Sequence, residues 1–297
     1  MPTSTTRPVG SHVFVGKGLV AGALRTAQEI DAEALQVFVG NPRGWAPSAG
    51  NPAVDEAFRA TCLDRGLRSF VHTPYLVNLG SPTAATYERS VATVEHTLRR
   101  AARIGAEGVV VHTGSCVDDG AVYAALRQVR EGLLPVLDRL DGASGEPGPW
   151  LLLEPTAGQG RSLCGGVEEL APYLDALDRH PRVGICLDTC HVFAAGAPLD
   201  EPGGATRTLD LLVEVAGAGR LRLVHANDSK DARGSLRDRH ERIGDGHIGE
   251  AAFAELFAHP ATAGVPFVAE TPGSGDGGVP GTCVPLLKKL RESVAAR

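Results

Sequence analysis

The chain has 297 residues, of which 43% are hydrophobic, and a formal net charge of −6 at pH 7. This length fits one large α/β barrel or two ordinary domains, and the acidic balance gives no bulk sign of a nucleic-acid binder. No run approaches the roughly 20 apolar residues that a membrane span needs, and the six cysteines form no Cys-x-x-Cys pair, which indicates a reduced, cytoplasmic protein away from membranes.

Short apolar, β-branched runs recur along the chain and predict eight strands. In chain order these are 12–15, 34–39, 69–72, 109–112, 151–154, 183–188, 221–225 and 266–270. Helical spacing of apolar residues lies between them and is clearest over 87–104 and 123–140. Because short strands that are apolar throughout belong in parallel sheets covered on both faces, the pattern predicts an α/β fold of repeated βα units.

A closed barrel and an open doubly wound sheet both fit this alternation. The open sheet is disfavoured because no Gly-x-Gly-x-x-Gly follows the first strand. Polar residues close nearly every strand at its C-terminal end, where a barrel keeps its active site. We therefore predict a single (β/α)8 TIM barrel with its active site at the C-terminal ends of the strands. It would form one domain over 1–297, with 1–8 as a loose N-terminal tail and 142–149 as a loop before strand five.

Nine side chains that could ligate a metal lie at or just after the predicted strand ends. They are His72, His112, Glu154, Asp188, His191, His225, Asp238, His240 and Glu270. One strand-end histidine is usually structural, but here three histidines and three carboxylates close six different strands. Imidazoles and carboxylates bind Zn²⁺ or Mn²⁺, and nine donors exceed what one tetrahedral ion can use, so the pattern indicates a multinuclear site. His12 begins the first predicted strand and receives no role.

Long motifs identify a resemblance at this point. They are Phe-Val-Gly-Asn-Pro-Arg-Gly-Trp (38–45), His-Thr-Pro-Tyr-Leu-Val-Asn-Leu (72–79), Val-His-Thr-Gly (111–114), Leu-Glu-Pro-Thr-Ala-Gly-Gln-Gly (153–160), Cys-Leu-Asp-Thr-Cys-His-Val-Phe-Ala-Ala-Gly (186–196), His-Ala-Asn-Asp-Ser-Lys (225–230), Asp-Arg-His-Glu-Arg-Ile-Gly-Asp-Gly-His-Ile-Gly (238–249) and Glu-Thr-Pro (270–272). Over nearly its whole length the chain resembles the endonuclease IV family of zinc-dependent apurinic/apyrimidinic-site DNA repair enzymes.

The resemblance implies three zinc ions per chain, with Mn²⁺ possible at one site. His72, His112 and Glu154 would hold one ion. Glu154, Asp188, His225 and Glu270 would hold the second, and His191, Asp238 and His240 the third. Glu154 and Glu270 would be the catalytic carboxylates, because clustered ions can activate water and stabilise the leaving oxygen without a separate side-chain base.

The implied partner is double-stranded DNA with abasic or 3′-blocked damage, cut by a monomeric enzyme. It would hydrolyse the phosphodiester 5′ to an abasic site, leave a 3′-hydroxyl and also trim 3′ ends. Arg43, Tyr75 and Leu76 would enter the base stack, where unstacking costs least beside a missing base. Other predicted DNA contacts from the strand-end loops are Asn78, Arg161, Lys230 and Arg239. Gly44 and Ala197 depart from the family pattern, and the sequence does not fix how tightly the protein binds DNA near Arg43.

Two other functions stay open from the residues alone. A sugar isomerase or epimerase on the same barrel would also gather Glu, Asp and His at strand ends, but around a single divalent ion. A protein that binds damaged DNA without cutting it would be expected to have lost at least one ligand position. A metal count separates the two enzyme hypotheses, because about three zinc ions favour the nuclease and one exchangeable Mn²⁺ or Mg²⁺ favours the isomerase.

Overall fold

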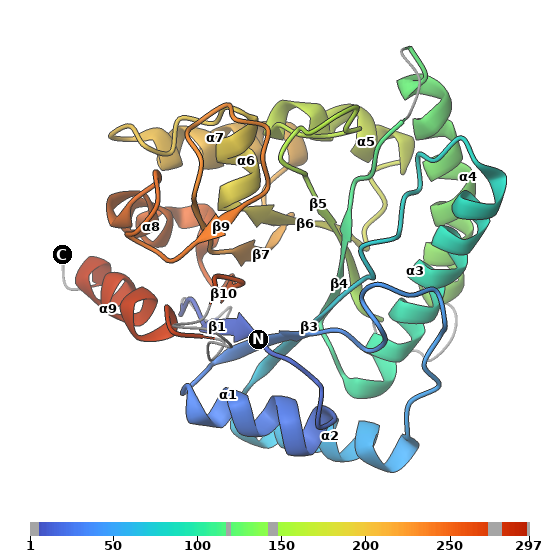
Figure 1. Ribbon diagram of the computed structural model, residues 1–297, viewed down its shortest axis with the longest axis horizontal. Helices are drawn as coiled ribbons and strands as arrows, with labels where there is room; N and C mark the ends of the chain where they lie inside the picture. Colours follow the sequence, from blue (N-terminus) through green and yellow to red (C-terminus); the bar gives the residue numbers. More distant parts are fainter. Residues whose placement is uncertain (1–5, 117–119, 142–147, 273–280, 296–297) are drawn as a thin grey trace.

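The computed structural model describes residues 6–116, 120–141, 148–272 and 281–295. Among them, eight strands close into a barrel in the order β1-β10-β7-β6-β5-β4-β3-β2, with every neighbouring pair parallel. Figure 1 shows these strands at the centre of the molecule and the helices around them. The predicted (β/α)8 barrel is therefore confirmed.

The bounds of the elements follow the alternation that the sequence predicts. The barrel strands are β1 (Val9–His12), β2 (Ala34–Val37), β3 (Arg68–His72), β4 (Gly108–His112), β5 (Trp150–Glu154), β6 (Val183–Asp188), β7 (Leu221–His225) and β10 (Phe267–Ala269). A separate antiparallel pair is formed by β8 (Asp228–Ser229) and β9 (His240–Glu241). The α-helices are α1 (Arg25–Glu29), α2 (Pro52–Arg65), α3 (Ala84–Ile104), α4 (Val122–Asp141), α5 (Leu170–Ala176), α6 (Thr189–Ala195), α7 (Gly204–Ala216), α8 (Glu250–Ala258) and α9 (Val284–Ala295). Shorter helical turns are η1 (Leu19–Leu24), η2 (Val167–Glu169) and η3 (Pro260–Thr262).

The first predicted strand is wrong, although the other seven agree with the structure to within two residues at each end. The strand is Val9–His12, so His12 ends it rather than begins it. The sequence misled because Gly10 interrupts the apolar run. A Cβ at Gly10 would lie 1.6 Å from the carbonyl oxygen of Ala34 on the neighbouring strand, so glycine is needed where β1 and β2 meet.

Part of the predicted tail and of the predicted loop lies outside the described residues, namely 1–5 and 142–147. From Arg7 onwards the chain contacts the barrel: Arg7 Nε donates to Thr262 Oγ1 at 2.9 Å, and the Pro8 carbonyl accepts from Phe267 N at 2.7 Å. The division of 1–297 into one domain stays a prediction. Within the part of the chain that the structure describes, no helix has the length and apolar character to span a membrane.

Two hydrophobic clusters form the core. The larger one contains apolar side chains from the strands and from the helices that surround them. The smaller one takes one side chain from each of seven strands: Ala34, Phe70, Val110, Leu152, Cys186, Leu223 and Val268. Because alternate residues of a strand point to the same side of a sheet, this second cluster forms a layer that fills the barrel interior.

A buried ion pair between α2 and α3 gives a first prediction. Arg100 and Asp55 are 2% and 3% exposed, the Arg100 guanidinium donates to both Asp55 oxygens, and it also donates to the Ala49 carbonyl at 3.0 Å. Arg100→Met leaves the carboxylate buried without its partner, so we expect a loss of about 3–5 kcal/mol in the free energy of unfolding, measured by urea denaturation.

Arg99 is the matched control, because it is the adjacent residue and its ion pair with Glu95 is on the surface, with the Arg99 side chain 61% exposed. Arg99→Met should cost less than about 1 kcal/mol. Equal losses in the two variants would contradict the argument from burial.

Candidate metal centre

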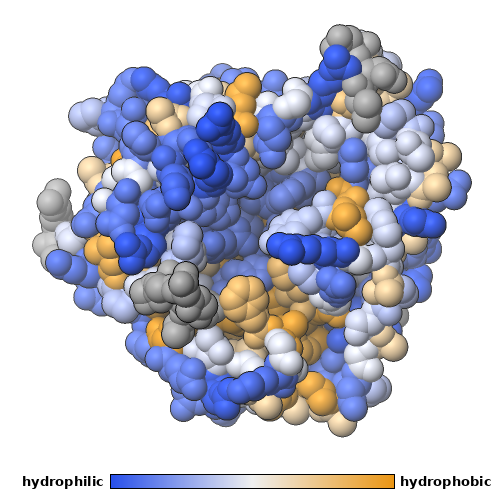
Figure 2. Space-filling view, in the orientation of Figure 1, coloured by the Kyte–Doolittle hydropathy of each residue, from blue (hydrophilic) through white to orange (hydrophobic). Residues whose placement is uncertain are grey.

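Eight polar side chains form a ring directly above the layer that fills the barrel, one from each strand position. Each lies two residues after a residue of that layer, or after Gly10 on β1, and so points to the same side of the sheet. The ring consists of His12, Gln36, His72, His112, Glu154, Asp188, His225 and Glu270. In Figure 2 this face of the molecule is hollowed near its middle, with hydrophilic residues above the hollow and hydrophobic residues below it.

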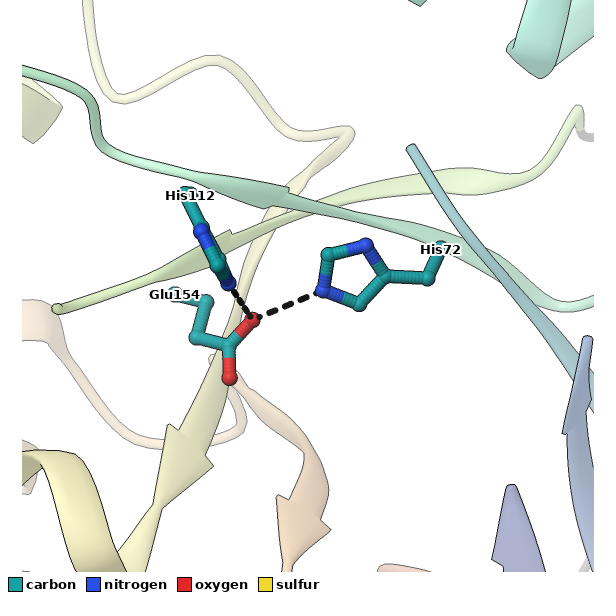
Figure 3. Close-up of side chains that lie close together, drawn as sticks. All are labelled: His72, His112 and Glu154. Carbon is teal, nitrogen blue, oxygen red and sulfur yellow. Dashed lines mark hydrogen bonds and ion pairs between the residues drawn. The ribbon is translucent and has the colours of Figure 1, made fainter. Parts of the chain in front are cut away.

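The first group of donors is His72, His112 and Glu154, from the ends of β3, β4 and β5. Figure 3 shows both imidazole rings directed at one carboxylate oxygen: His72 Nε2 lies 3.2 Å and His112 Nε2 3.3 Å from Glu154 Oε2. His72 and Glu154 are buried, and the His112 side chain is 26% exposed. The group can therefore be reached from the mouth of the barrel at His112.

The second group is Glu154, Asp188, His225 and Glu270. His225 Nδ1 lies 2.8 Å from Glu154 Oε1, 3.2 Å from Glu270 Oε2 and 3.8 Å from Asp188 Oδ2. Glu154 offers its other oxygen to the first group, so this carboxylate stands between the two. Burial raises the pKa of Glu154, but His225 and His112 lower it well below its usual range, so the bridging group is a carboxylate at neutral pH.

The third group is His191, Asp238 and His240. Asp188 caps α6 by accepting from the His191 backbone N–H at 3.0 Å, and this turn directs the His191 ring into the site. His240 lies on β9, paired with Ser229 of β8. Asp238 Oδ1 lies 3.2 Å from His191 Nε2 and 3.1 Å from His240 Nε2. The structure thus gathers all nine predicted donors into three adjoining groups.

The orientation of the rings fits metal ions. His72 Nδ1 donates to the Thr73 carbonyl at 2.7 Å and His191 Nδ1 donates to the Pro155 carbonyl at 3.0 Å. A neutral ring with its proton on Nδ1 presents an Nε2 lone pair, and here each Nε2 faces a carboxylate oxygen. Such a contact is favourable when a metal ion lies between the two acceptors or when a second proton makes the ring an imidazolium. Donation from the distal nitrogen to a carbonyl is the usual arrangement of a metal-bound histidine.

Two buried nitrogens of the third group support the same conclusion. The Nε2 atoms of His191 and His240 make no hydrogen bond of acceptable geometry to any described residue, although Asp238 is close to both. Burial lowers the pKa of His191, but the opposing effect of Asp188 and Asp238 is larger and raises this pKa to about 10. Burial also lowers the pKa of His240, while Asp188 and Asp238 raise it to about 9. The group therefore favours positive charge, whether a proton or a metal ion carries it.

Comparison with known proteins places this geometry in a family. Residues 24–295 match the family model described as xylose isomerase-like TIM barrel. A protein named probable endonuclease 4 from Streptomyces coelicolor is 56% identical over 285 residues, which cover 96% of this chain and 95% of that protein. Its namesake from Streptomyces avermitilis is 55% identical over 98% of this chain and 92% of that protein. The chain belongs to the endonuclease IV family.

A solved structure agrees with the assignment to endonuclease IV. The crystal structure of endonuclease IV from Thermus thermophilus superimposes with a TM-score of 0.82 at 35% sequence identity, and the match covers 96% of this chain and 99% of that one. The resemblance found from the motifs is therefore confirmed over nearly the full length of the chain. The number and identity of bound ions remain predictions.

Sequence reasoning missed four buried or half-buried polar residues of this endonuclease IV site. His12 and Gln36 complete the ring, and both contact Glu270. Asn227 donates to Asp188 Oδ2 at 2.7 Å. Asp228 accepts backbone N–H bonds from the loop that follows β9, including Gly244 at 2.9 Å and Ile248 at 2.8 Å, and so holds the loop beyond His240. The two-residue offset from the barrel-filling layer was the signal that could have identified His12 and Gln36.

The predicted DNA contacts at the rim fall into two kinds. Tyr75 and Leu76 are 54% and 38% exposed, and the Tyr75 ring lies 6.3 Å from the His112 ring, centroid to centroid. Arg43 is on the loop after β2, next to a pocket of about 320 Å³ lined by Gly44 and Trp45. Arg161 and Lys230 are exposed. Their exposure places these side chains on the surface, where a ligand that approaches the centre from outside would meet them.

Two other predicted contacts are engaged within the protein. Asn78 joins the loops after β3 and β4, because its Oδ1 accepts from Ser115 N at 3.0 Å and its Nδ2 donates to Ser115 Oγ at 3.3 Å. Arg239 is exposed but forms a two-pronged ion pair with Asp231. Their roles toward DNA stay predictions, and the structure adds that either would have to exchange these partners to bind a phosphate.

Proposed function

We propose that this member of the endonuclease IV family hydrolyses the phosphodiester 5′ to abasic sites in double-stranded DNA, leaving a 3′-hydroxyl, by means of three bound zinc ions. Trimming of blocked 3′ ends belongs to the same proposal, since it breaks the same kind of bond. The single observation that carries the proposal is the bridging position of Glu154 between two donor groups, with the third group beside them.

The chain's own residues prepare a site for a phosphate group. Glu154, Asp188 and Glu270 place three carboxyl groups in one pocket, with Glu154 and Asp188 fully buried, and cations would balance their charge. When bound, divalent ions would neutralise the charge of the phosphate, acidify water and stabilise the leaving oxygen. His72 and His191 are oriented by carbonyl groups, so these two donors need little rearrangement.

The rim residues support recognition of a distorted duplex. Tyr75 is an exposed aromatic side chain beside Leu76, and burial together with Glu270 and Glu154 raises the pKa of Tyr75 to about 12. The ring is therefore an uncharged phenol at neutral pH and can stack on bases. An apolar pair at the entrance of an acidic pocket suits a duplex opened where a base is missing.

Incision of an abasic duplex by the purified protein tests the proposal. We expect cleavage 5′ to the abasic site, a 3′ end that a DNA polymerase can extend, and loss of cleavage after treatment with a chelator, with recovery when Zn²⁺ is restored. The same duplex without the lesion serves as the control substrate. Cleavage that persists in the chelator, or no cleavage with zinc restored, would exclude the proposed function.

Tyr75→Ala is expected to weaken binding to the abasic duplex by about 5- to 150-fold, because loss of one aromatic stacking platform costs about 1–3 kcal/mol. Zinc content should not change, since Tyr75 belongs to none of the three donor groups. Fluorescence anisotropy of a labelled duplex measures the affinity. Tyr123 on α4 is the matched control, as an 86% exposed tyrosine on the outer ring of helices, and Tyr123→Ala should bind like the unaltered protein.

A further inference from the structure

We propose that Gln36 is a positioning residue that fixes which nitrogen of His225 faces the metal centre and holds Glu270 beside it. The inference rests on the proposed function only in taking His225 and Glu270 as metal ligands. Gln36 lies on β2 in the ring of eight, two residues after Ala34 of the barrel-filling layer, and is fully buried. Its amide is not itself a member of any donor group.

Both ends of the Gln36 amide contact residues of the ring. Gln36 Nε2 donates to Glu270 Oε1 at 2.6 Å, and Gln36 Oε1 lies 2.9 Å from His225 Nε2. Nε2 also lies 2.9 Å from His12 Nδ1. A buried amide that served the scaffold alone would be satisfied by backbone groups, whereas all three of these contacts are side chains of the site.

Chemistry decides the orientation of this amide. The Glu270 carboxylate can only accept, so the NH₂ end of Gln36 must face it and the carbonyl end must face His225. A carbonyl oxygen also only accepts, so His225 carries a proton on Nε2. The opposite orientation would set the amide oxygen against the Glu270 carboxylate and leave two buried acceptors in contact.

The tautomer of His225 follows from this contact. With a proton on Nε2, the neutral ring has its lone pair on Nδ1, which is the nitrogen that lies among Glu154, Asp188 and Glu270. Gln36 thus does for His225 what the Thr73 and Pro155 carbonyls do for His72 and His191, except that it uses a side chain. It also restrains Glu270, which lies just beyond the end of β10.

Gln36→Met tests the inference, because methionine has a similar shape and can neither donate to Glu270 nor accept from His225. Competition with a chromophoric chelator measures zinc affinity in the absence of DNA. We expect affinity for one of the bound ions to fall by about 10- to 100-fold, the range for loss of a partner of a metal ligand. The kcat for incision should fall with it, while KM for the abasic duplex stays unchanged because Gln36 is buried away from the rim.

Val37→Ala is the control, since Val37 is adjacent to Gln36, fully buried and part of the larger hydrophobic cluster. It should lower thermal stability without changing zinc affinity. Equal weakening in the two variants, or zinc affinity in Gln36→Met like that of the unaltered protein, would overturn the positioning role. Because this readout needs no DNA, failure of the incision assay would leave the inference standing, and unchanged affinity would remove it without touching the proposed function.

A second measurement needs no variant and so does not depend on folding of Gln36→Met. NMR of the zinc-loaded protein with isotope-labelled histidine reports the state of each ring nitrogen. We expect a proton on Nε2 of His225 and metal at Nδ1. Zinc at Nε2, or a proton on Nδ1, would overturn the inference.

Discussion

Glu270→Gln is expected to lower kcat for incision of the abasic duplex by on the order of 10²–10³-fold or more while the duplex still binds. Glu270 Oε2 lies 3.2 Å from His225 Nδ1, and Oε1 accepts from Gln36. Glutamine keeps the size of the side chain but removes one negative charge from the second donor group. Burial raises the pKa of Glu270, but His225 and His12 lower it well below its usual range, so the charge that the variant removes is fully present at neutral pH.

Binding and turnover should separate in this variant. The exposed side chains at the rim are unchanged, so anisotropy with the abasic duplex should give nearly the original dissociation constant, while single-turnover kinetics show the slow step. Glu292→Gln on the outer helix α9 is the control, because Glu292 is exposed. If Glu270→Gln cut the duplex at the original rate, the chemistry of incision would not depend on this centre.

The strand-end donors could be predicted because short apolar runs mark the strands and helical spacing of apolar residues marks the helices between them. In a parallel barrel the C-terminal ends of all strands meet at one face, so polar residues that close separate strands must lie close together. His72, His112 and Glu154 show this directly, since they are far apart in sequence and gather within hydrogen-bonding distance. Gly10 interrupts the apolar run of the first strand, so the prediction placed His12 at the start of that strand. In the structure His12 ends the strand and belongs to the ring.

Gln36 escaped prediction for a different reason. Its place in the ring follows from the two-residue period of a strand, but glutamine is not a usual metal ligand, so residue type gave no signal. Its role depends on the orientation of one amide between two side chains that come from strands far away in the sequence. Such a contact depends on the register of the strands, which pattern alone does not fix.

The rim was harder to predict from composition than the centre. The loop after β7 contains several arginines, yet Arg233 pairs with Glu201, Arg239 with Asp231 and Arg242 with Asp245. Neighbouring carboxylates therefore offset much of the positive charge that the sequence suggested there. Surface pairs of this kind are weak and can be exchanged for phosphate contacts, so the loop can still contribute to binding, with a salt dependence smaller than its arginine count implies.

Asp238→Ala is expected to remove one zinc ion of about three per chain and to lower kcat by about 10- to 100-fold. Asp238 Oδ1 is the carboxylate oxygen between His191 Nε2 and His240 Nε2, at 3.2 and 3.1 Å. Without it, these two buried Nε2 atoms face each other across the third group. Neither has a hydrogen-bond partner among the described residues. Metal analysis of the purified variant, together with its incision rate, measures both effects.

The matched control for Asp238→Ala is Asp245→Ala, which removes an aspartate that is 54% exposed and pairs with Arg242 on the surface. This control should keep the full metal count and rate. The comparison also decides between the two enzyme hypotheses, because a sugar isomerase on this barrel needs one ion and gives the third group no task. One ion per chain, in the unaltered protein and in Asp238→Ala alike, would therefore favour the isomerase, since only a multinuclear enzyme loses an ion when the third group is broken.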